Sequence, residues 1–223
     1  KVNISSCKNL VSINCDDNNI KYLNAENCSK LSSISCIKNP MEDINLIGCR
    51  NLRTLSCTEG NLTTINIEDC LKLEGLALQN NKLNELDLSI FYNLKTIYCE
   101  NNQLKEIDVS NSNVFKNLRA FNNQLQSINI RNGNNKAITT FKTYGNPDLK
   151  CITVDDPAYS KEHWKEIDEW TEFSEDCSNS VDEYTGNISE IFPNPADNSI
   201  SLPSEFDYDK FNIIDINGKV IIE

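Results

Sequence analysis

The chain has 223 residues and a formal net charge of −12, but this charge is unevenly spread. Residues 1–154 hold 15 acidic and 17 basic residues, residues 155–184 hold 11 and 2, and residues 185–223 hold 7 and 2. This distribution argues against a nucleic-acid partner, because displacing counterions from nucleic acid requires a basic stripe. No stretch reaches the roughly 18 consecutive apolar residues of a membrane helix, so we expect no membrane insertion.

From residue 10 onward the sequence repeats one apolar pattern at an interval of 21 residues. The pattern is L-x-x-L-x-C-x-x-N-x-L-x-x-L-x-L-x-x-C, and it starts at Leu10, Leu31, Leu52, Leu73, Leu94, Phe115 and, two residues late, Ile138. Val2, Ile4 and Cys7 fit the rear half of a preceding coil, which we expect to have been cut through. A single unit has too little apolar surface to fold alone, whereas stacked units bury one another's leucines. The repeat therefore predicts a mainly β solenoid, a right-handed coil of about seven repeats over residues 1–154.

Both halves of each coil are expected to be extended. The L-x-x-L-x-C half predicts a short strand with alternating inward side chains, and stacking these strands predicts a parallel sheet. A coil of 21 residues leaves little room for a helix, so the second half, such as residues 83–89, is expected to be extended as well. The ninth position of each coil is an asparagine, except in the third coil, where it is Gly60. We expect the asparagine side chains to face inward and to form hydrogen bonds with main-chain groups of adjacent coils. These asparagines are Asn18, Asn39, Asn81, Asn102, Asn123 and Asn146.

Eight of the ten cysteines fall into two columns of the repeat, Cys15, Cys36, Cys57 and Cys99 in one and Cys7, Cys28, Cys49 and Cys70 in the other. Side chains in one column point the same way rather than toward each other, so we predict buried free thiols that act as small apolar residues. The sequence has one histidine, His163, and no C-x-x-C pair. It therefore indicates no metal, no cofactor and no catalytic cysteine.

Residues 155–177 depart from the repeat and are expected to cap it. Trp164, Ile167 and Trp170 lie three residues apart, which predicts a short amphipathic helix with Ser160 as its N-cap. Such a helix would cover the apolar end of the last coil. A sugar-stacking platform formed by the tryptophans is the alternative interpretation.

The outward slots of the sheet change character along the chain. Early coils carry mostly small or polar residues there, whereas the later coils carry Tyr98, Glu100, Arg119, Phe121, Lys142 and Tyr144. We expect these six to be the ligand-binding residues, with the aromatic rings in a diagonal track and Lys95 and Lys116 nearby, because exposed aromatics beside arginine are favoured at interface hot spots. The alternative is that these aromatics only pack on neighbouring coils and stabilise the sheet.

Two resemblances extend this interpretation. The repeat resembles the short bacterial leucine-rich repeats, and internalin-like repeats with a cysteine in place of a core leucine look similar. In such surface proteins a tryptophan-containing end segment is often flanked by cysteines, and we pair Cys151 with Cys177, which lie outside both columns. Residues 178–187 have the composition of a linker.

Residues 188–223 resemble part of the C-terminal sorting domain of type IX secretion substrates. The F-P-N-P segment at 192–195 and the later D-I-N-G-K-V segment at 215–220 carry this resemblance. It implies a small partial β-sandwich, contact with the secretion machinery, and a location outside a Gram-negative bacterium, either secreted or on the outer surface. An ordinary small β domain is the alternative.

The sequence thus favours a monomeric, non-catalytic recognition module that binds a protein or glycan through the face of its sheet. The alternatives are a passive stalk or spacer and an accessory region of a larger secreted enzyme. Against an enzyme of its own stand the single histidine and the scattering of acidic residues over exposed slots.

Overall fold

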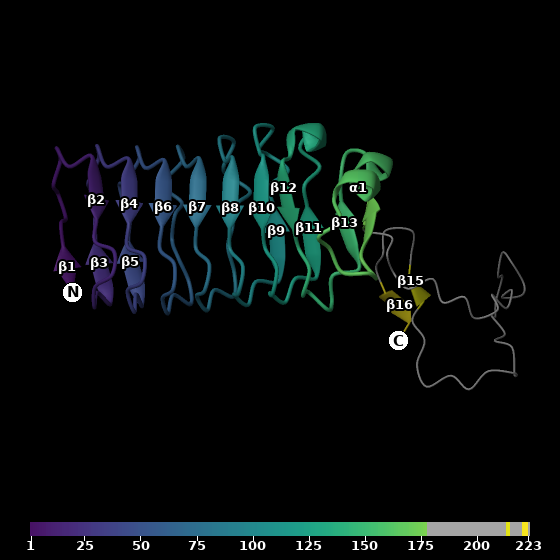
Figure 1. Cartoon of the computed structure of the whole chain (residues 1–223), viewed down its shortest axis with the longest axis horizontal. Helices are drawn as coiled ribbons and strands as arrows, with labels where there is room; N and C mark the ends of the chain where they lie inside the picture. Colours follow the sequence, from purple (N-terminus) through teal and green to yellow (C-terminus); the bar gives the residue numbers. More distant parts are fainter. Residues whose placement is uncertain (178–212, 215–219, 223) are drawn as a thin grey trace, which may run out of the picture. The chain divides into compact units, whose positions relative to one another are not determined.

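A computed structural model describes residues 1–177, 213–214 and 220–222 of the chain. Within residues 1–177 the chain forms a parallel β solenoid whose coils stack side by side in sequence order (Figure 1). The solenoid predicted from the 21-residue period is confirmed. The predicted linker at 178–187 lies outside the described residues, as does most of the predicted sorting domain at 188–223. In that last segment the structure describes only the antiparallel pair β15 (Ile213–Ile214) and β16 (Val220–Ile222).

One continuous sheet of seven parallel strands, the front sheet, forms one side of the solenoid. Each strand comes from the first half of a coil and pairs with the strand 21 or 23 residues away, for example Leu55 with Leu76 and Leu118 with Phe141. The strands are β2 (Ser12–Asn14), β4 (Ser33–Ser35), β6 (Thr54–Ser56), β7 (Gly75–Ala77), β8 (Thr96–Tyr98), β10 (Asn117–Arg119) and β12 (Thr140–Lys142).

The second halves of the coils form the back of the solenoid in two separate sheets. The first contains β1 (Val2–Asn3), β3 (Tyr22–Asn24) and β5 (Asp43–Asn45). The second contains β9 (Glu106–Asp108), β11 (Ser127–Asn129), β13 (Cys151–Thr153) and β14 (Glu172–Ser174). The extended second half is therefore confirmed for most coils.

Between β5 and β9 the back of the solenoid contains no strand. Residues 83–89 were expected to be extended like the other second halves, but neither they nor residues 62–67 pair as strands. Ile67, Leu86 and Leu88 are nevertheless all buried, so the interruption concerns main-chain pairing and not the core. The coils remain joined where these halves begin, because Lys82 N–H donates to Leu62 C=O at 2.8 Å.

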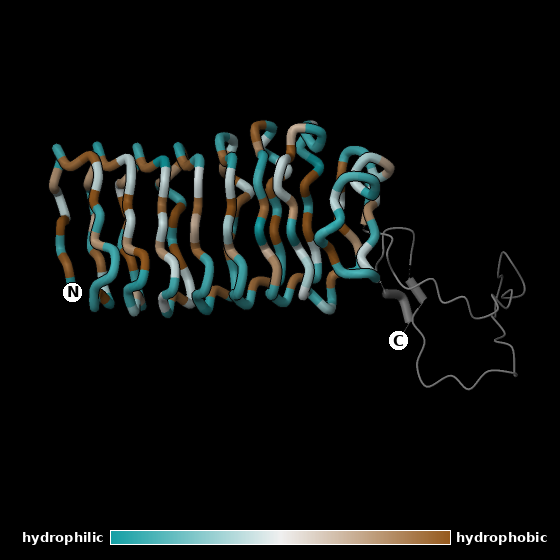
Figure 2. The backbone as a smooth tube through the Cα atoms, viewed as in Figure 1, coloured by the Kyte–Doolittle hydropathy of each residue, from teal (hydrophilic) through white to brown (hydrophobic). Residues whose placement is uncertain are grey.

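The core is a continuous column of buried apolar side chains running through the stacked coils. Figure 2 shows apolar and polar residues alternating along the coils, as expected for strands with one buried face. Leu31, Leu52 and Leu73, which share one slot, are all fully buried. Because most inward slots are apolar in every coil, each interior coil packs on neighbours with a similar buried surface.

The asparagine series is buried as predicted, except at its first member. Nδ2 of Asn102 donates to the carbonyls of Leu78 and Cys99, and its Oδ1 accepts from Leu83 N–H at 2.9 Å. Each interior asparagine thereby joins its own coil to the preceding one. Asn18 is exposed, and its Nδ2 donates to the carbonyls of Cys15 and Asp16 in its own coil. Gly60 occupies the same slot, where an added Cβ would lie 2.7 Å from Asn81 Oδ1.

A second polar series on the back side was not predicted. Side-chain oxygens accept a hydrogen bond from the main-chain N–H two residues ahead at Asn3, Asn24, Asn45, Asn66, Asp87, Asp108 and Asn129. These turns bend the chain where each second half ends. The 21-residue spacing of Asn and Asp is readable in the sequence and could have revealed them.

The cap contains a shorter helix than predicted. Helix α1 spans Pro157–His163, and its N-cap is Asp156, whose side chain accepts from Tyr159 N–H at 3.0 Å. The prediction of Ser160 as N-cap is wrong, because the carboxylate before Pro157 already caps the first turn. Trp164 ends the helix, and Trp170 is 48% exposed well beyond it, so the tryptophans do not share a helix face.

After α1 the chain completes one further turn of the solenoid. Glu166 forms a parallel bridge with Lys142 beside the front sheet, and β14 pairs with β13 at the back. Trp164 stacks on Phe141 with a ring-centroid distance of 4.2 Å, which covers the apolar end of the last repeat. A short 3₁₀ turn, η1 (Asn135–Ala137), accommodates the insertion before β12.

The cysteine columns are not uniformly buried free thiols. Cys36 and Cys57 form a disulfide between neighbouring coils, with a Cα–Cα distance of 5.0 Å. The prediction failed here because stacked coils bring facing Cα atoms within disulfide range, and a small side-chain rotation then suffices for bonding. Cys7 is exposed and Cys15 is half-buried. Cys28, Cys49, Cys70 and Cys99 are buried free thiols.

Outside the two columns, Cys151 and Cys177 are joined by a disulfide. This bond connects β13 to the end of the cap. In the described part of the chain, no helix has the length and apolar character needed to cross a membrane.

Candidate functional site

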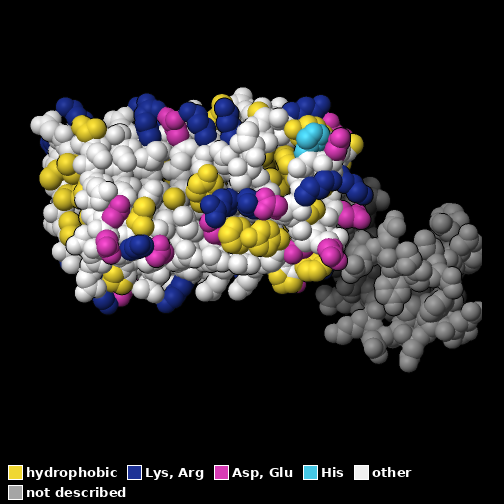
Figure 3. Space-filling view, in the orientation of Figure 1, with side chains coloured by type: hydrophobic (Ala, Val, Ile, Leu, Met, Phe, Trp, Pro, Cys, Tyr) yellow, Lys and Arg dark blue, Asp and Glu magenta, His cyan; other side chains and the backbone are white. Residues whose placement is uncertain are grey.

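The front sheet carries a cluster of aromatic and charged side chains over its later coils. Figure 3 shows hydrophobic side chains gathered beside charged ones on this face. The residues that form this cluster, called the front patch below, are Tyr98, Glu100, Arg119, Phe121, Lys142 and Tyr144, contributed by β8, β10, β12 and the residues that follow them. The structure thus brings all six sequence-predicted site residues onto neighbouring coils.

Arg119 lies at the centre of the front patch. Its guanidinium carbon lies 5.2 Å from the ring centroid of Tyr98 and 5.6 Å from that of Phe121. Cation–π contacts of this kind hold a guanidinium in a defined position. The expected continuous aromatic track is therefore interrupted, because Arg119 lies between the first ring and the other two.

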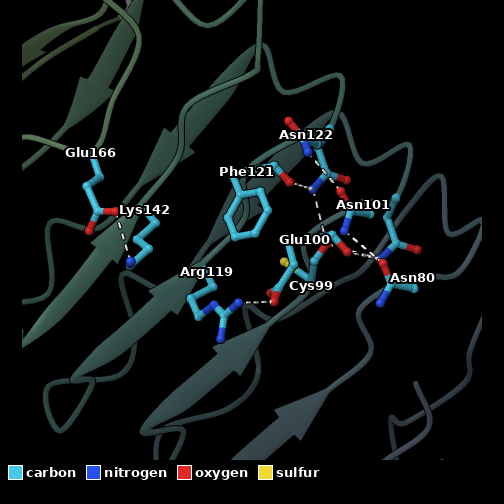
Figure 4. Close-up of polar contacts among 11 residues, drawn as sticks. Asn80, Cys99, Glu100, Asn101, Arg119, Phe121, Asn122, Lys142 and Glu166 are labelled. Carbon is cyan, nitrogen blue, oxygen red and sulfur yellow. Dashed lines mark hydrogen bonds and ion pairs between the residues drawn. The ribbon is translucent and has the colours of Figure 1, made fainter. Parts of the chain in front are cut away.

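Glu100 occupies an outward slot of the sheet, as the alternation predicts, but its side chain is buried instead of exposed. It is 3% exposed, and its Oε1 lies 2.7 Å from Arg119 Nη2 (Figure 4). The Arg119 side chain on the next coil covers it. The alternation of inward and outward residues along one strand does not predict burial by a neighbouring strand. Two buried atoms of this pair, Glu100 Oε2 and Arg119 Nε, have no hydrogen-bond partner. The ion pair therefore fixes the arginine but leaves part of its own hydrogen-bonding capacity unused.

The C-terminal side of the patch is formed by stacked rings and a second ion pair. Phe121 and Tyr144 stack with centroids 4.7 Å apart and ring planes inclined by 8°. Lys142 Nζ lies 2.8 Å from Oε1 of Glu166 in the cap (Figure 4). Tyr144 is 39% exposed, more than any other ring of the patch. The cap segment thus takes part in shaping the patch.

A row of exposed asparagines borders the patch and was not predicted. Asn101 Nδ2 donates to Asn80 Oδ1 at 2.7 Å, and Asn122 Nδ2 donates to Asn101 Oδ1 at 2.9 Å (Figure 4). All three residues have a φ between 55° and 59°, a left-handed conformation that asparagine tolerates. The repeated N-N dipeptides at 80–81, 101–102 and 122–123 are the sequence signal for this row.

A row of charged side chains lies along the other margin of the front sheet. Glu74 is paired with Arg53 and with Lys95, whose Nζ lies 2.7 Å from Glu74 Oε2. These partners hold the pKa of the Glu74 carboxyl below its usual range. Lys116, the next cation in this row, takes part in none of the ion pairs among the described residues.

A groove of about 680 Å³ lies on the opposite side, where the back sheet is interrupted. Its lining includes the carboxylates of Glu68, Glu85, Asp87, Glu106 and Asp108. This groove is separate from the front patch, since the two share no residue.

The described residues contain no arrangement suited to metal chemistry, since none of their His, Cys, Asp and Glu side chains form a group of three or more that could hold an ion. The buried thiols are poor nucleophiles at neutral pH. Burial raises the pKa of Cys49 to about 11 and that of Cys70 to about 12, and it also raises the pKa of Cys99.

Comparison with known proteins identifies the fold. The chain is similar to a solved structure described as the functional domain of InlJ from Listeria monocytogenes, which includes a cysteine ladder. The TM-score is 0.59 at 22% sequence identity, and the match covers 69% of this chain and 38% of that one. No family model and no curated protein matches the chain. The chain therefore has the fold of an internalin-type, cysteine-ladder solenoid.

Proposed function

We propose that this chain is a secreted or cell-surface, non-catalytic recognition module that binds a protein or glycan ligand through the front patch. The observation that carries this proposal is the change in the outward side chains of the front sheet. The inward slots of the interior coils stay buried and mostly apolar, whereas the outward slots change from Ser35 and Ser56 to Tyr98, Arg119 and Phe121. Core packing does not require that change, so a surface role accounts for it better.

The contacts of Phe121 favour a protein ligand over a glycan at the centre of the patch. Stacking on a sugar requires a free aromatic face, and the Phe121 ring is already contacted by Tyr144 on the next coil and by the Arg119 guanidinium. Ring edges and a fixed guanidinium beside them are typical of protein interface hot spots. The side chains of the patch also contact one another across neighbouring coils, and such preorganisation lowers the entropy cost of binding.

Secretion of the module is part of the proposal. The type IX motifs at 192–195 and 215–220 support export by the secretion machinery of a Gram-negative bacterium, to the outer surface or the medium. The shared fold with the InlJ domain is consistent with a surface-exposed role. We propose further that the module acts as a monomer.

The test compares two triple-alanine variants of the same sheet. The patch variant is Tyr98→Ala, Phe121→Ala and Tyr144→Ala, and the control is Ser35→Ala, Ser56→Ala and Gln79→Ala. Ligands obtained by pull-down or glycan array are then titrated against both, after circular dichroism has shown that both are folded. We expect the patch variant to lose at least tenfold in affinity and the control less than twofold. Equal affinities would exclude the front patch as the binding site.

A further inference from the structure

The front sheet reverses its charge from the early coils to the late ones. In the front segments of coils one to four, at 10–17, 31–38, 52–59 and 73–80, the charged residues are two cations, Lys38 and Arg53, and four carboxylates, Asp16, Asp17, Glu59 and Glu74. In the front segments of coils five to seven, at 94–101, 115–122 and 138–145, the charged residues are four cations and one carboxylate. The cations are Lys95, Lys116, Arg119 and Lys142, and the carboxylate is Glu100. That carboxylate is buried. The exposed charge of these three segments is therefore cationic, on a chain whose net charge is −12. Lys95 is paired with Glu74 and Lys142 with Glu166, so the two remaining cations are Lys116 and Arg119.

Two of these cations keep hydrogen-bond donors free. Lys116 is exposed and takes part in none of the ion pairs in the described chain. Arg119 has Glu100 as the only ionic partner among the described residues, through one nitrogen of its guanidinium, and its side chain remains 37% exposed. A guanidinium carries five N–H donors, so most of them are not used by Glu100. The buried carboxylate and the two flanking rings thus hold Arg119 while leaving donors available to a ligand.

The polar side chains between these two cations already form hydrogen bonds with one another. Asn117 Nδ2 donates to Thr96 Oγ1 at 3.1 Å, and Thr139 Oγ1 donates to Asn117 Oδ1 at 2.8 Å. The front sheet is continuous, so its main chain offers no free strand edge there. Recognition at this place must therefore come from side chains, and the side chains with free donors are positively charged.

We infer that the front patch recognises an acidic peptide segment of a protein partner, an inference that rests on the proposed function. Lys116 and Arg119 lie three residues apart along the chain, a separation of about 10 Å at the usual rise per residue of a strand. Carboxylates of an extended peptide bind at these two positions, and an apolar side chain beside them packs on the edges of the Phe121 and Tyr144 rings. The guanidinium accepts a carboxylate in the planar geometry that arginine favours.

Fluorescein-labelled poly-L-glutamate tests this inference by fluorescence anisotropy at low ionic strength. Because the whole protein is acidic, nonspecific attraction of a polyanion is disfavoured, and any binding must come from a local cationic surface. The variants are Lys116→Gln and Arg119→Gln, separately and together. The matched control is Lys38→Gln, which removes an exposed cation from the front segment of coil two. Lys116→Gln keeps the test valid if Arg119→Gln destabilises the fold, since Lys116 has no ion pair to lose.

We expect poly-L-glutamate to bind the wild-type protein with an affinity that falls as salt is added. The double variant should bind at least tenfold more weakly, and the control should stay within twofold of wild type. Absence of binding, or an equal loss in the control, would overturn the inference. So would tighter binding of a sulfated polysaccharide than of poly-L-glutamate, because the site would then recognise glycans.

The two proposals fail in different ways. If the triple-alanine patch variant loses a protein ligand while Lys116→Gln and Arg119→Gln keep it, the recognition face stands and the acidic-peptide inference is wrong. If the ligand binds all of these variants equally, both proposals are wrong.

Discussion

The early and late coils of the front sheet share one scaffold and differ on its outer surface. Leu31 in coil two and Leu94 in coil five occupy the same inward slot and are both fully buried. In an outward slot the same two coils carry Ser35 and Tyr98. The comparison teaches that the inward slots determine the coil, while the outward slots are free to vary and so can be shaped for recognition.

Core truncations should have the largest effect, and the effect should be similar in both regions. Leu55→Ala in coil three and Leu118→Ala in coil six each remove a side chain that is at most 1% exposed. Each should lower the free energy of unfolding by about 2–5 kcal/mol, because a cavity remains in the stack. Urea denaturation measures both, and a loss below about 1 kcal/mol at either site would contradict an equally packed core.

Within the late coils, the Arg119–Glu100 ion pair should contribute more to the free energy of unfolding than the Lys142–Glu166 pair. Arg119→Ala leaves the buried Glu100 carboxylate without its partner and should cost about 1–3 kcal/mol of unfolding free energy. Lys142→Ala breaks a pair whose acidic member, Glu166, is 52% exposed, and should cost at most about 1 kcal/mol. The same denaturation experiment compares them. A larger loss for Lys142→Ala would show that Arg119 is not the anchored residue.

The smallest expected difference concerns thiols in one cysteine column. Cys15 in coil one is half-buried and Cys99 in coil five is fully buried, and burial raises the pKa of both thiols. A raised pKa leaves less thiolate at pH 8 in both cases, and alkylation of Cys99 is slowed further because the reagent cannot reach a fully buried thiol. Peptide mapping after iodoacetamide treatment should show Cys15 labelled at least tenfold faster. Equal rates in the folded protein would indicate that the later coils open readily.

The solenoid could be predicted from the sequence because its core repeats. The 21-residue spacing places Leu76 and Leu118 in the same slot, and burial of one slot implies burial of all interior ones. The cap helix was located less well, since Asp156 and Pro157 compete with Ser160 as helix-start signals and no repeat decides between them.

The candidate site was harder to predict, because burial and pairing of its side chains depend on residues of the neighbouring coils. Alternation places Glu100 outward, but Arg119 from the next coil covers it and makes it the buried anchor of the patch. The Cys36–Cys57 disulfide and the interruption of the back sheet between β5 and β9 likewise arise between coils with matching sequence patterns. Because the sequence pattern is the same in every coil, it does not predict which neighbouring coils form a disulfide or lack paired back strands.

Site-specific photo-crosslinking tests the central claim most directly, because it reports contact at one slot in two different coils. A benzophenone amino acid is placed at Phe121 in coil six or at Ile37 in coil two, which occupy the same outward slot and are both half-buried. With a ligand that binds the wild-type protein, we expect crosslinks from position 121 that excess unlabelled protein suppresses, and few from position 37. Equal crosslinking from both positions, or crosslinking from position 37 alone, would contradict the assignment of recognition to the late coils.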